Sequence, residues 1–401
     1  MGIQEKIKEI EAEYAKTQKN KATEGHLGLL KAKLAKLRTQ LLEPSGGGGK
    51  GEGFDVQKNG NARICMIGFP SVGKSTLLST LTDTKSLAAG YEFTTLTCIP
   101  GNLYYNNAKI QLLDLPGIIE GAADGRGRGR QVIAVGKASD MIWMVLDAGK
   151  AEAQKEKLTA ELEKCGIRLN KKRPNITITI NKIGGLKILS MKKLKYVKDE
   201  QIKSIFSLYK IHNAQISIRD DDVTIDDIID TIEGNRKYVP CIYIYNKIDV
   251  LSIEEVDEIA REPRTVVISC NLKLNFDTLL ARSWEELGLV RVFTKRKGHF
   301  PDLTDPLILS EDRGGCTVRQ AIEQIHRNLL LEFSHAQVWG RSVKFNPQSV
   351  GLSHPLSDLD VIQIYKKTGS KSKESKTQQA AKKVDVKATA KNAFGKKKEK
   401  K

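Results

Sequence analysis

Two short motifs in this chain combine the residue types that hold a nucleotide. The first, residues 68–75, reads Gly-Phe-Pro-Ser-Val-Gly-Lys-Ser, and the second, residues 246–249, reads Asn-Lys-Ile-Asp. Glycines let backbone N–H groups turn inward around phosphates. The ammonium of Lys74 can reach the β- and γ-phosphates, and the hydroxyl of Ser75 can coordinate Mg²⁺. The first motif therefore predicts a phosphate-binding loop.

The second motif predicts which base accompanies those phosphates. The carboxylate of Asp249 can accept hydrogen bonds from the N1–H and the exocyclic amine of guanine. Adenine lacks that amine, so it would leave the carboxylate unsatisfied, and such a site discriminates strongly. Asn246 can bind the N7 and O6 side of the purine, and the stem of Lys247 can lie across the ring. The two motifs together predict GTP.

A third group of residues lies between these motifs in the chain. Asp114-Leu115-Pro116-Gly117 follows an apolar stretch; Asp114 is expected to hold Mg²⁺ through water, and the Gly117 N–H to sense the γ-phosphate. The threonine-rich run 93–97 offers a hydroxyl for Mg²⁺, with Thr95 favoured over Thr94. An exposed β-strand is the alternative interpretation of that run.

The predicted site therefore has three overlapping sets of residues. The catalytic residues are Lys74, Thr95 and Gly117. The Mg²⁺ ligands are Ser75, Thr95 and Asp114. The residues that bind GTP are Gly68, Pro70, Ser71, Val72, Gly73, Lys74, Ser75, Thr76, Phe93, Thr94, Thr95, Asp114, Gly117, Asn246, Lys247, Asp249, Ser269, Cys270 and Asn271.

Apolar strands are expected to position these residues. A strand is predicted directly before the first motif and a helix directly after it, which is the context that a phosphate-binding loop requires. Open α/β sheets bind ligands at the carboxyl ends of their strands, and the motifs fall at such ends. The predicted strands are 63–67, 109–113, 141–147, 241–245 and 266–269.

These motifs carry a family resemblance. Residues 68–75, 93–96, 114–122 and 246–249 resemble an Obg-type GTPase, specifically the developmentally regulated GTP-binding protein (DRG) family of archaea and eukaryotes, over about residues 1–366. The resemblance implies an α/β fold: a Ras-like P-loop GTPase domain with a mostly parallel sheet, an N-terminal helical hairpin, an inserted small αβ subdomain and a C-terminal β-grasp TGS domain. It also implies hydrolysis of GTP to GDP and phosphate, and a zinc-finger-containing regulatory partner.

The expected domain boundaries follow composition and pattern. The N-terminal helical hairpin and a glycine linker cover residues 1–50, with the turn near Gly25, and the GTPase domain covers 60–290 with the inserted subdomain at 172–235. The TGS domain covers 291–366 and a disordered lysine-rich tail covers 367–401. A coiled-coil dimer seam is the alternative for the hairpin. Within the TGS domain, strands are predicted at 291–293, 307–309, 336–339, 342–344 and 361–365, and a helix at 317–328.

The charge of the chain is concentrated in its tail. The net charge is +18, and residues 366–401 carry 14 lysines against three acidic residues, or +11. Lysine tails suit phosphate backbones, so RNA is the expected partner, whereas a solubilising tail and a nuclear import signal are the alternatives. Six scattered cysteines are predicted to be reduced core thiols. With no apolar run long enough for a bilayer, we expect no membrane partner and a cytoplasmic protein, with a nuclear pool if the tail directs import.

One position predicts slow chemistry. Ras-type proteins follow Asp-x-x-Gly with a glutamine that orients the attacking water, whereas this chain has Ile118, which can neither donate nor accept a hydrogen bond. We expect a partner, a monovalent cation or another segment to supply the missing group. The resemblance suggests K⁺, although Ser71 replaces the asparagine typical of many K⁺-dependent GTPases. The Gly-Arg run 125–130 could supply an arginine to the phosphates or contact a partner, and a solvated loop is the alternative interpretation.

Three functions are consistent with these features. The favoured one is a DRG-type translation factor that acts on the ribosome, contacting rRNA or tRNA, because the lysine tail and the TGS resemblance both indicate RNA contact. The alternative is a nucleotide-switched scaffold that binds cytoskeletal or signalling proteins. A third is an ATP-using relative of the Obg group, which competition of ATP against GTP would reveal.

Overall fold

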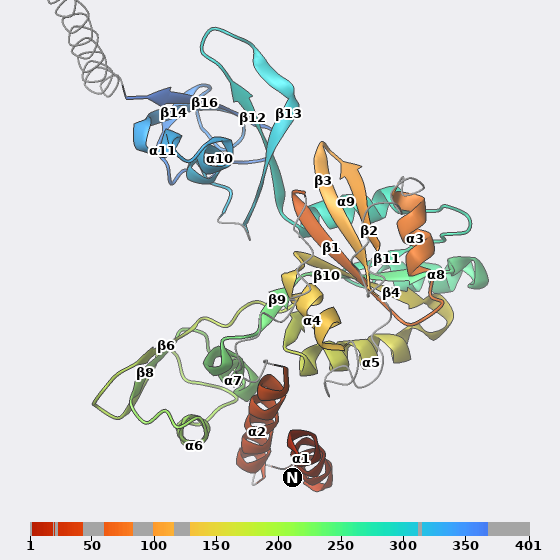
Figure 1. The fold of residues 1–401 in the computed structure, drawn as a ribbon, viewed down its shortest axis with the longest axis vertical. Coiled ribbons are helices and arrows are strands. Elements are labelled where there is room, and N and C mark those ends of the chain that lie inside the picture. The colour runs from red at the N-terminus through yellow and green to blue at the C-terminus, as the bar shows by residue number, and fades with distance from the viewer. Residues whose placement is uncertain are drawn as a thin grey trace, which may run out of the picture. The chain divides into compact units, whose positions relative to one another are not determined.

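The structure, a computed structural model, describes residues 2–18, 20, 23–42, 60–82, 99–115, 129–311 and 315–367 (Figure 1). The chain divides into two compact units, Met1–Leu287 and Gly288–Lys401. The first unit contains the predicted nucleotide site.

A six-stranded, mostly parallel sheet forms the centre of the first unit. Its strand order is β11-β10-β4-β1-β3-β2, and only the β2–β3 pair is antiparallel. The strands are β1 (Ala62–Ile67), β2 (Ile99–Tyr105), β3 (Ala108–Asp114), β4 (Met141–Asp147), β10 (Cys241–Asn246) and β11 (Thr265–Val267).

Helices cover both faces of this sheet, which explains why its central strands read as continuous apolar runs. Every residue of β1 is buried. On one face, Cys65 and Met144 pack in a core with residues of α4, α5 and α8. On the other face, the indole N–H of Trp143 in β4 donates to the hydroxyl of Ser283 in α9 at 3.1 Å. The helices are α3 (Lys74–Leu81), α4 (Gly129–Ala138), α5 (Ala151–Lys164), α8 (Ile253–Ala260) and α9 (Phe276–Glu286).

A small αβ subdomain is inserted between β4 and β10. It leaves and rejoins the core through the parallel pair β5 (Ile167–Leu169) and β9 (Lys237–Val239). Its three-stranded sheet has the order β6-β8-β7 and packs on two helices around Phe206, which is fully buried. Its elements are β6 (Ile176–Ile180), β7 (Leu186–Ser190), α6 (Asp199–Leu208), β8 (Ala214–Ile218) and α7 (Ile225–Glu233).

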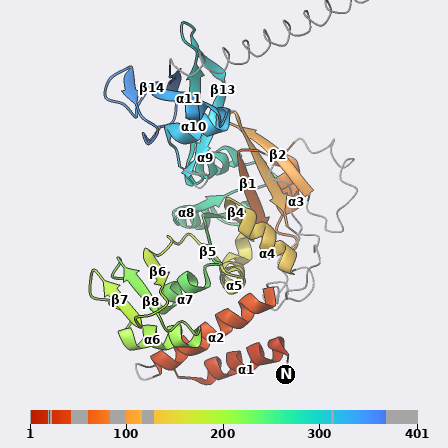
Figure 2. The same cartoon turned by 60° about the vertical axis from the view of Figure 1, so that its left-hand side comes forward.

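The two N-terminal helices, α1 (Ile3–Lys16) and α2 (Glu24–Leu42), pack against each other, and α2 packs on α6 and α7 of the insert, as Figures 1 and 2 both show. Small residues allow this close approach. A Cβ on Gly28 would lie 3.0 Å from Ile225 Cδ1, and Ala32 is fully buried in the contact. The chain reverses before Glu24, so the turn predicted near Gly25 lies a few residues earlier, because Gly25 is already helical.

The second unit is a β-grasp: a five-stranded sheet of order β13-β12-β16-β14-β15 with helices packed on one face. Strands β12 and β16 pair in parallel, and the other pairs are antiparallel. The elements are β12 (Leu289–Lys295), β13 (Pro301–Ser310), α10 (Val318–Ile325), α11 (Leu329–Glu332), β14 (Phe333–Trp339), β15 (Gln348–Val350) and β16 (Asp360–Lys366).

Two sequence predictions in this unit are wrong. Residues 342–344 form no strand; the edge strand beside β14 is β15, which begins six residues later. A strand was predicted there because Val343 is apolar, but this residue packs against the core from a turn. The helix predicted to reach Asn328 ends at Ile325, since His326 has an extended backbone with φ −170° and ψ 124°.

Two whole-chain predictions can be compared with the structure. Five cysteines, Cys65, Cys165, Cys241, Cys270 and Cys316, are free thiols, whereas Cys98 lies outside the described residues. Burial raises the pKa of the Cys165 and Cys241 thiols to about 12, so neither is a reactive thiolate at neutral pH. None of the helices that the structure describes is both long and apolar enough to cross a bilayer.

Candidate functional site

The predicted phosphate-binding loop connects β1 to α3 at the carboxyl end of the sheet. Ser71 and Gly73 both have left-handed backbones, with φ of 62° and 97°, which turns the loop tightly into the helix. A Cβ on Gly73 would stand 2.3 Å from Asn246 Nδ2, and one on Gly68 would stand 2.3 Å from the Val145 carbonyl oxygen. Both positions therefore require glycine for space, and Gly73 requires it for its left-handed backbone as well.

Lys74, the first residue of α3, is held inside this loop. Its ammonium donates to the carbonyl oxygens of Gly68 at 2.9 Å and Phe69 at 2.8 Å, and its side chain is buried. Burial lowers the pKa of Lys74 from its usual range, while the charge of Asp114 opposes that shift. Because an ammonium has three hydrogens, one remains for a phosphate oxygen.

Ser75 and Asp114 form a pair of oxygen donors beside the loop. The Ser75 hydroxyl donates to Asp114 Oδ2 at 2.7 Å, which connects the first turn of α3 to the end of β3. The other carboxylate oxygen, Asp114 Oδ1, is buried without a hydrogen-bond partner. A buried carboxylate oxygen of this kind requires a water or a cation. Mg²⁺ prefers such oxygen ligands, so these two residues fit the predicted metal site.

Asn246 ties the phosphate-binding loop to the base-reading loops. It is 2% exposed; its Nδ2 donates to the Val72 carbonyl at 2.8 Å and its Oδ1 accepts from the Cys270 N–H at 3.1 Å. The second hydrogen of Nδ2 remains available for a purine nitrogen. Asn246 therefore connects the end of β10 to the phosphate-binding loop and to the loop that contains Cys270.

Asp249, the residue predicted to read the base, is positioned by Ser269. The Ser269 hydroxyl donates to Asp249 Oδ1 at 2.8 Å, and Ser269 is fully buried. This bond orients the carboxylate and leaves its second oxygen for the guanine N1–H and amine. Ser269 thus contributes to the site through its side-chain hydroxyl.

Asp147 belongs to the site, and the sequence prediction missed it. Its Oδ2 accepts from the Lys247 ammonium at 2.7 Å, and the hydrogen bond from Lys247 lowers the pKa of Asp147. Lys247 has a left-handed backbone with φ 66°, so the ion pair fixes a side chain that leaves an unusual backbone position. Asp147 ends β4 and lies opposite Asn246 in the register of β10. Its place at the end of an apolar strand, like that of Asn246, is the sequence feature that could have predicted Asp147 as a site residue.

The remaining predicted residues are either exposed or outside the described part of the chain. Pro70, Ser75, Thr76 and Asn271 are exposed beside the buried part of the site. Phe93, Thr94, Thr95 and Gly117, which were predicted to bind GTP, lie outside the described residues, as do Ile118 and positions 125–128 of the Gly-Arg run.

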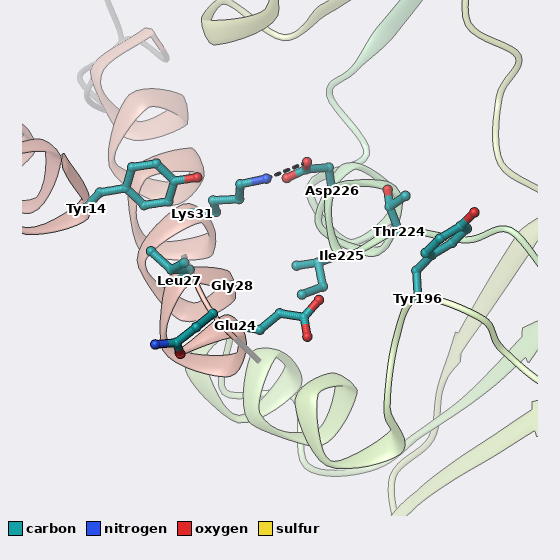
Figure 3. A pocket seen from close by; sticks show the side chains of 10 residues that line it. Tyr14, Glu24, Leu27, Gly28, Lys31, Tyr196, Thr224, Ile225 and Asp226 are labelled. Atoms are coloured by element: carbon teal, nitrogen blue, oxygen red, sulfur yellow. Dashed lines mark hydrogen bonds and ion pairs between the residues drawn. The ribbon is translucent and has the colours of Figure 1, made fainter. Parts of the chain in front are cut away.

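A separate cavity of about 630 Å³ lies between the helical pair and the insert (Figure 3). Tyr14 of α1, Lys31 of α2 and Asp226 of α7 line it, and the Lys31 ammonium donates to the Asp226 carboxylate at 2.8 Å. It shares no lining residue with the phosphate-binding loop or the base-reading motif. The cavity is therefore distinct from the nucleotide site.

The fold and the site define a P-loop GTPase: a buried lysine in a glycine loop, a serine–aspartate pair suited to Mg²⁺, and a carboxylate oriented for guanine, all at one edge of a parallel sheet. The chain belongs to the developmentally regulated GTP-binding protein family. It is 59% identical over 368 residues to developmentally-regulated G-protein 1 of Arabidopsis thaliana, covering 92% of each chain. It is 58% identical over 368 residues to developmentally-regulated GTP-binding protein 2 of Homo sapiens, covering 92% of this chain and 100% of that one.

Family models match the same parts of the chain. Residues 63–182 match a family described as 50S ribosome-binding GTPase, residues 183–289 match the C-terminal region of that domain, and residues 290–366 match the TGS domain. Among solved structures, the G domain of the T. maritima FeoB iron transporter aligns with a TM-score of 0.31 at 15% identity, covering 56% of this chain and 98% of that one. The assignment to this family therefore rests on the sequence relatives and the family models. They confirm the predicted fold class and GTP hydrolase activity.

Proposed function

We propose that this GTPase is a ribosome-associated translation factor in the cytoplasm, whose slow intrinsic turnover is stimulated by a partner or a cation. The observation that carries this proposal is the match of residues 63–182 to a family described as ribosome-binding GTPases. A TGS domain at residues 290–366 and the +11 charge of residues 366–401 support it, because lysine-rich segments bind phosphate backbones.

The described residues define the chemistry that such a factor would perform. Lys74 would neutralise the β- and γ-phosphates, and Asp249 would select guanine through the carboxylate oxygen that Ser269 does not bind. Ser75 and Asp114 would hold Mg²⁺, which supplies charge stabilisation at the phosphates when bound. Sequence position 118 provides no side chain to orient water, so the rate depends on an external group. We propose that a zinc-finger regulatory protein or K⁺ supplies this group. Ser71 argues against K⁺, because many K⁺-dependent GTPases have asparagine at this position.

Co-sedimentation with ribosomes tests the ribosomal role. At low salt the full chain should pellet with ribosomes, and a version ending at Leu287, which lacks the second unit and the tail, should remain in the supernatant. A version ending at residue 367 lacks only the tail, so it shows how much the tail contributes to sedimentation. Unchanged sedimentation of the 1–287 version would contradict the proposal. A chain that hydrolyses GTP but never pellets would favour the scaffold alternative.

A further inference from the structure

The second unit presents one sheet face on which most side chains are aromatic or polar. Residues that alternate along a strand point to opposite faces. In β14, Ala336 and Val338 lie in the core beneath α10 and α11, so His335, Gln337 and Trp339 point away from it. In β16, Ile362 and Ile364 face the core in the same way. The opposite positions, Val361, Gln363 and Tyr365, therefore share the outward face with those of β14.

The strand register arranges these outward residues in rows. Val361 lies between Phe293 of β12 and Trp339 of β14, which gives one row with an aromatic ring on each side. Four residues along β14, or ~13 Å, His335 lies opposite Tyr365. Both pairs are partly exposed, whereas the core-facing Val338 is fully buried.

Neighbouring side chains hold three rings of this face in place. The His335 and Tyr365 rings are stacked, with centroids 4.6 Å apart and an interplanar angle of 6°. The Tyr365 hydroxyl also donates to Gln337 Oε1 at 2.9 Å. The Lys295 ammonium lies 4.6 Å from the centroid of the Trp339 ring. The face is therefore pre-organised, which lowers the entropic cost of binding a flat ligand.

Positive charge surrounds this aromatic face at the end where Tyr365 lies. Arg296 and Lys297 follow β12, and Lys366 and Lys367 end β16 and follow it; all four are exposed. Lys366 alone of these is paired within the described residues, with Glu332 at 2.9 Å. The 14 lysines of residues 366–401 begin at the same strand end. Cations at the rim of aromatic rings match the phosphates and bases of a nucleic acid strand.

We infer that the face formed by Phe293, His335, Trp339 and Tyr365 is a stacking platform for single-stranded RNA. An open sheet face whose aromatic side chains stack unpaired bases is an established solution for reading single strands. Between the two aromatic rows, the amide of the partly exposed Gln337 can face the edges of such bases, whereas Gln363 is buried, with 5% of its surface exposed. This inference deepens the proposed ribosomal function, on which its choice of RNA rests, by naming the surface and the kind of RNA.

Binding of a 12-nucleotide fluorescein-labelled oligouridine to the full chain tests the platform. Fluorescence anisotropy in 150 mM salt should show an affinity at least roughly 25-fold weaker for Trp339→Leu combined with Tyr365→Leu, since each lost stacked base costs about fivefold or more. The dependence of affinity on salt should stay unchanged in this variant. Replacing Arg296 and Lys297 by glutamate should instead reduce that salt dependence.

Tyr104→Leu is the matched control, because Tyr104 is 71% exposed on β2 in the other unit. It should leave RNA affinity unchanged. Wild-type affinity in the double variant, with a preserved melting temperature and GTP turnover rate, would overturn the platform and leave the ribosomal proposal to its own co-sedimentation test.

A second measurement avoids substitutions altogether. Photo-crosslinking of wild-type protein to an oligonucleotide that contains 4-thiouridine should label peptides that include Phe293, Trp339 or Tyr365. Crosslinks confined to other parts of the chain would contradict the platform even if the double variant failed to fold.

Discussion

At the scale of single residues, the two carboxylate oxygens of Asp249, the residue predicted to read the base, have different surroundings. Ser269 holds Asp249 Oδ1 at 2.8 Å, and the other oxygen remains for guanine. The sequence predicted the motif because each functional group was present at a fixed spacing. It could not predict the role of the Ser269 side chain, because that role depends on how the strand ends of β10 and β11 meet.

Asp249→Asn should change base selection. The amide nitrogen of asparagine donates where the carboxylate accepts, so it no longer matches the guanine N1–H and amine but does match the carbonyl that xanthine carries at the same position. We expect GTP affinity to fall at least a hundredfold and binding of xanthosine triphosphate to rise. Competition of both nucleotides against a labelled GDP measures this. GTP affinity equal to wild type would contradict the assignment of Asp249.

Asp147→Ala should release the Lys247 side chain. Because this ion pair is partly exposed, we expect only about a two- to fivefold rise in the dissociation constant for GDP. Asp147→Asn keeps a hydrogen-bond acceptor and should show a smaller effect. Titration of a fluorescent GDP analogue compares the three proteins, and equal affinities would show that the pair does not position Lys247.

The same pair predicts a pH profile. The folded-state pKa of Asp147 is lowered from 3.8, so its contribution is complete above that value and is lost only as the pH falls through the lower, folded-state pKa. The difference in GDP affinity between wild type and Asp147→Ala should therefore be constant from pH 5 to pH 8. A difference that shrinks within this window would mean that Asp147 is not ionised as the structure indicates.

At the scale of elements, a buried charge cluster joins the insert to the GTPase core. Asp230 of α7 is buried and accepts from Arg168 of β5 at 2.7 and 2.8 Å and from Arg236 at 3.2 Å. Arg168 and Arg236 flank the points where the chain enters and leaves the insert. Their shared carboxylate therefore fixes the orientation of that subdomain on the core.

Asp230→Ala should destabilise the first unit substantially. It would leave two guanidinium groups, with 14% and 6% of their side chains exposed, without their shared counter-ion. Breaking a buried pair in this way costs about 3–5 kcal/mol, which corresponds to a melting temperature lower by roughly 10 °C. Asp257→Ala removes a surface pair whose aspartate is 60% exposed, and it should change stability by less than about 0.5 kcal/mol. Equal melting temperatures for the two variants would contradict this account.

Element predictions succeeded where the pattern was strong and failed where tertiary packing decided. The apolar runs of β4 and β10 are buried on both faces and were evident from the sequence. The strand predicted at 342–344 does not exist, because an apolar residue in a turn resembles a strand residue in a short alternating pattern. The sequence likewise gave no signal for the docking of α2 on the insert, which depends on small residues fitting under Ile225.

At the scale of the whole molecule, the predicted class of protein is confirmed by relatives that match 92% of the chain. Motif order predicted the GTPase, because few folds bring a glycine loop, an Asp-x-x-Gly and an Asn-Lys-x-Asp to one sheet edge. The sequence pattern could not reveal the aromatic face of the second unit, since its four rings come from three strands that pair only in the folded protein.

Steady-state GTP turnover with and without ribosomes tests the central claim most directly. Alone, the protein should hydrolyse GTP on the order of 10⁻³ s⁻¹ or slower, because Ile118 cannot orient water. Ribosomes should raise that rate at least roughly tenfold, and Lys74→Ala should show no turnover in either condition. A wild-type rate that ribosomes leave unchanged would contradict the proposal that this GTPase acts on the ribosome.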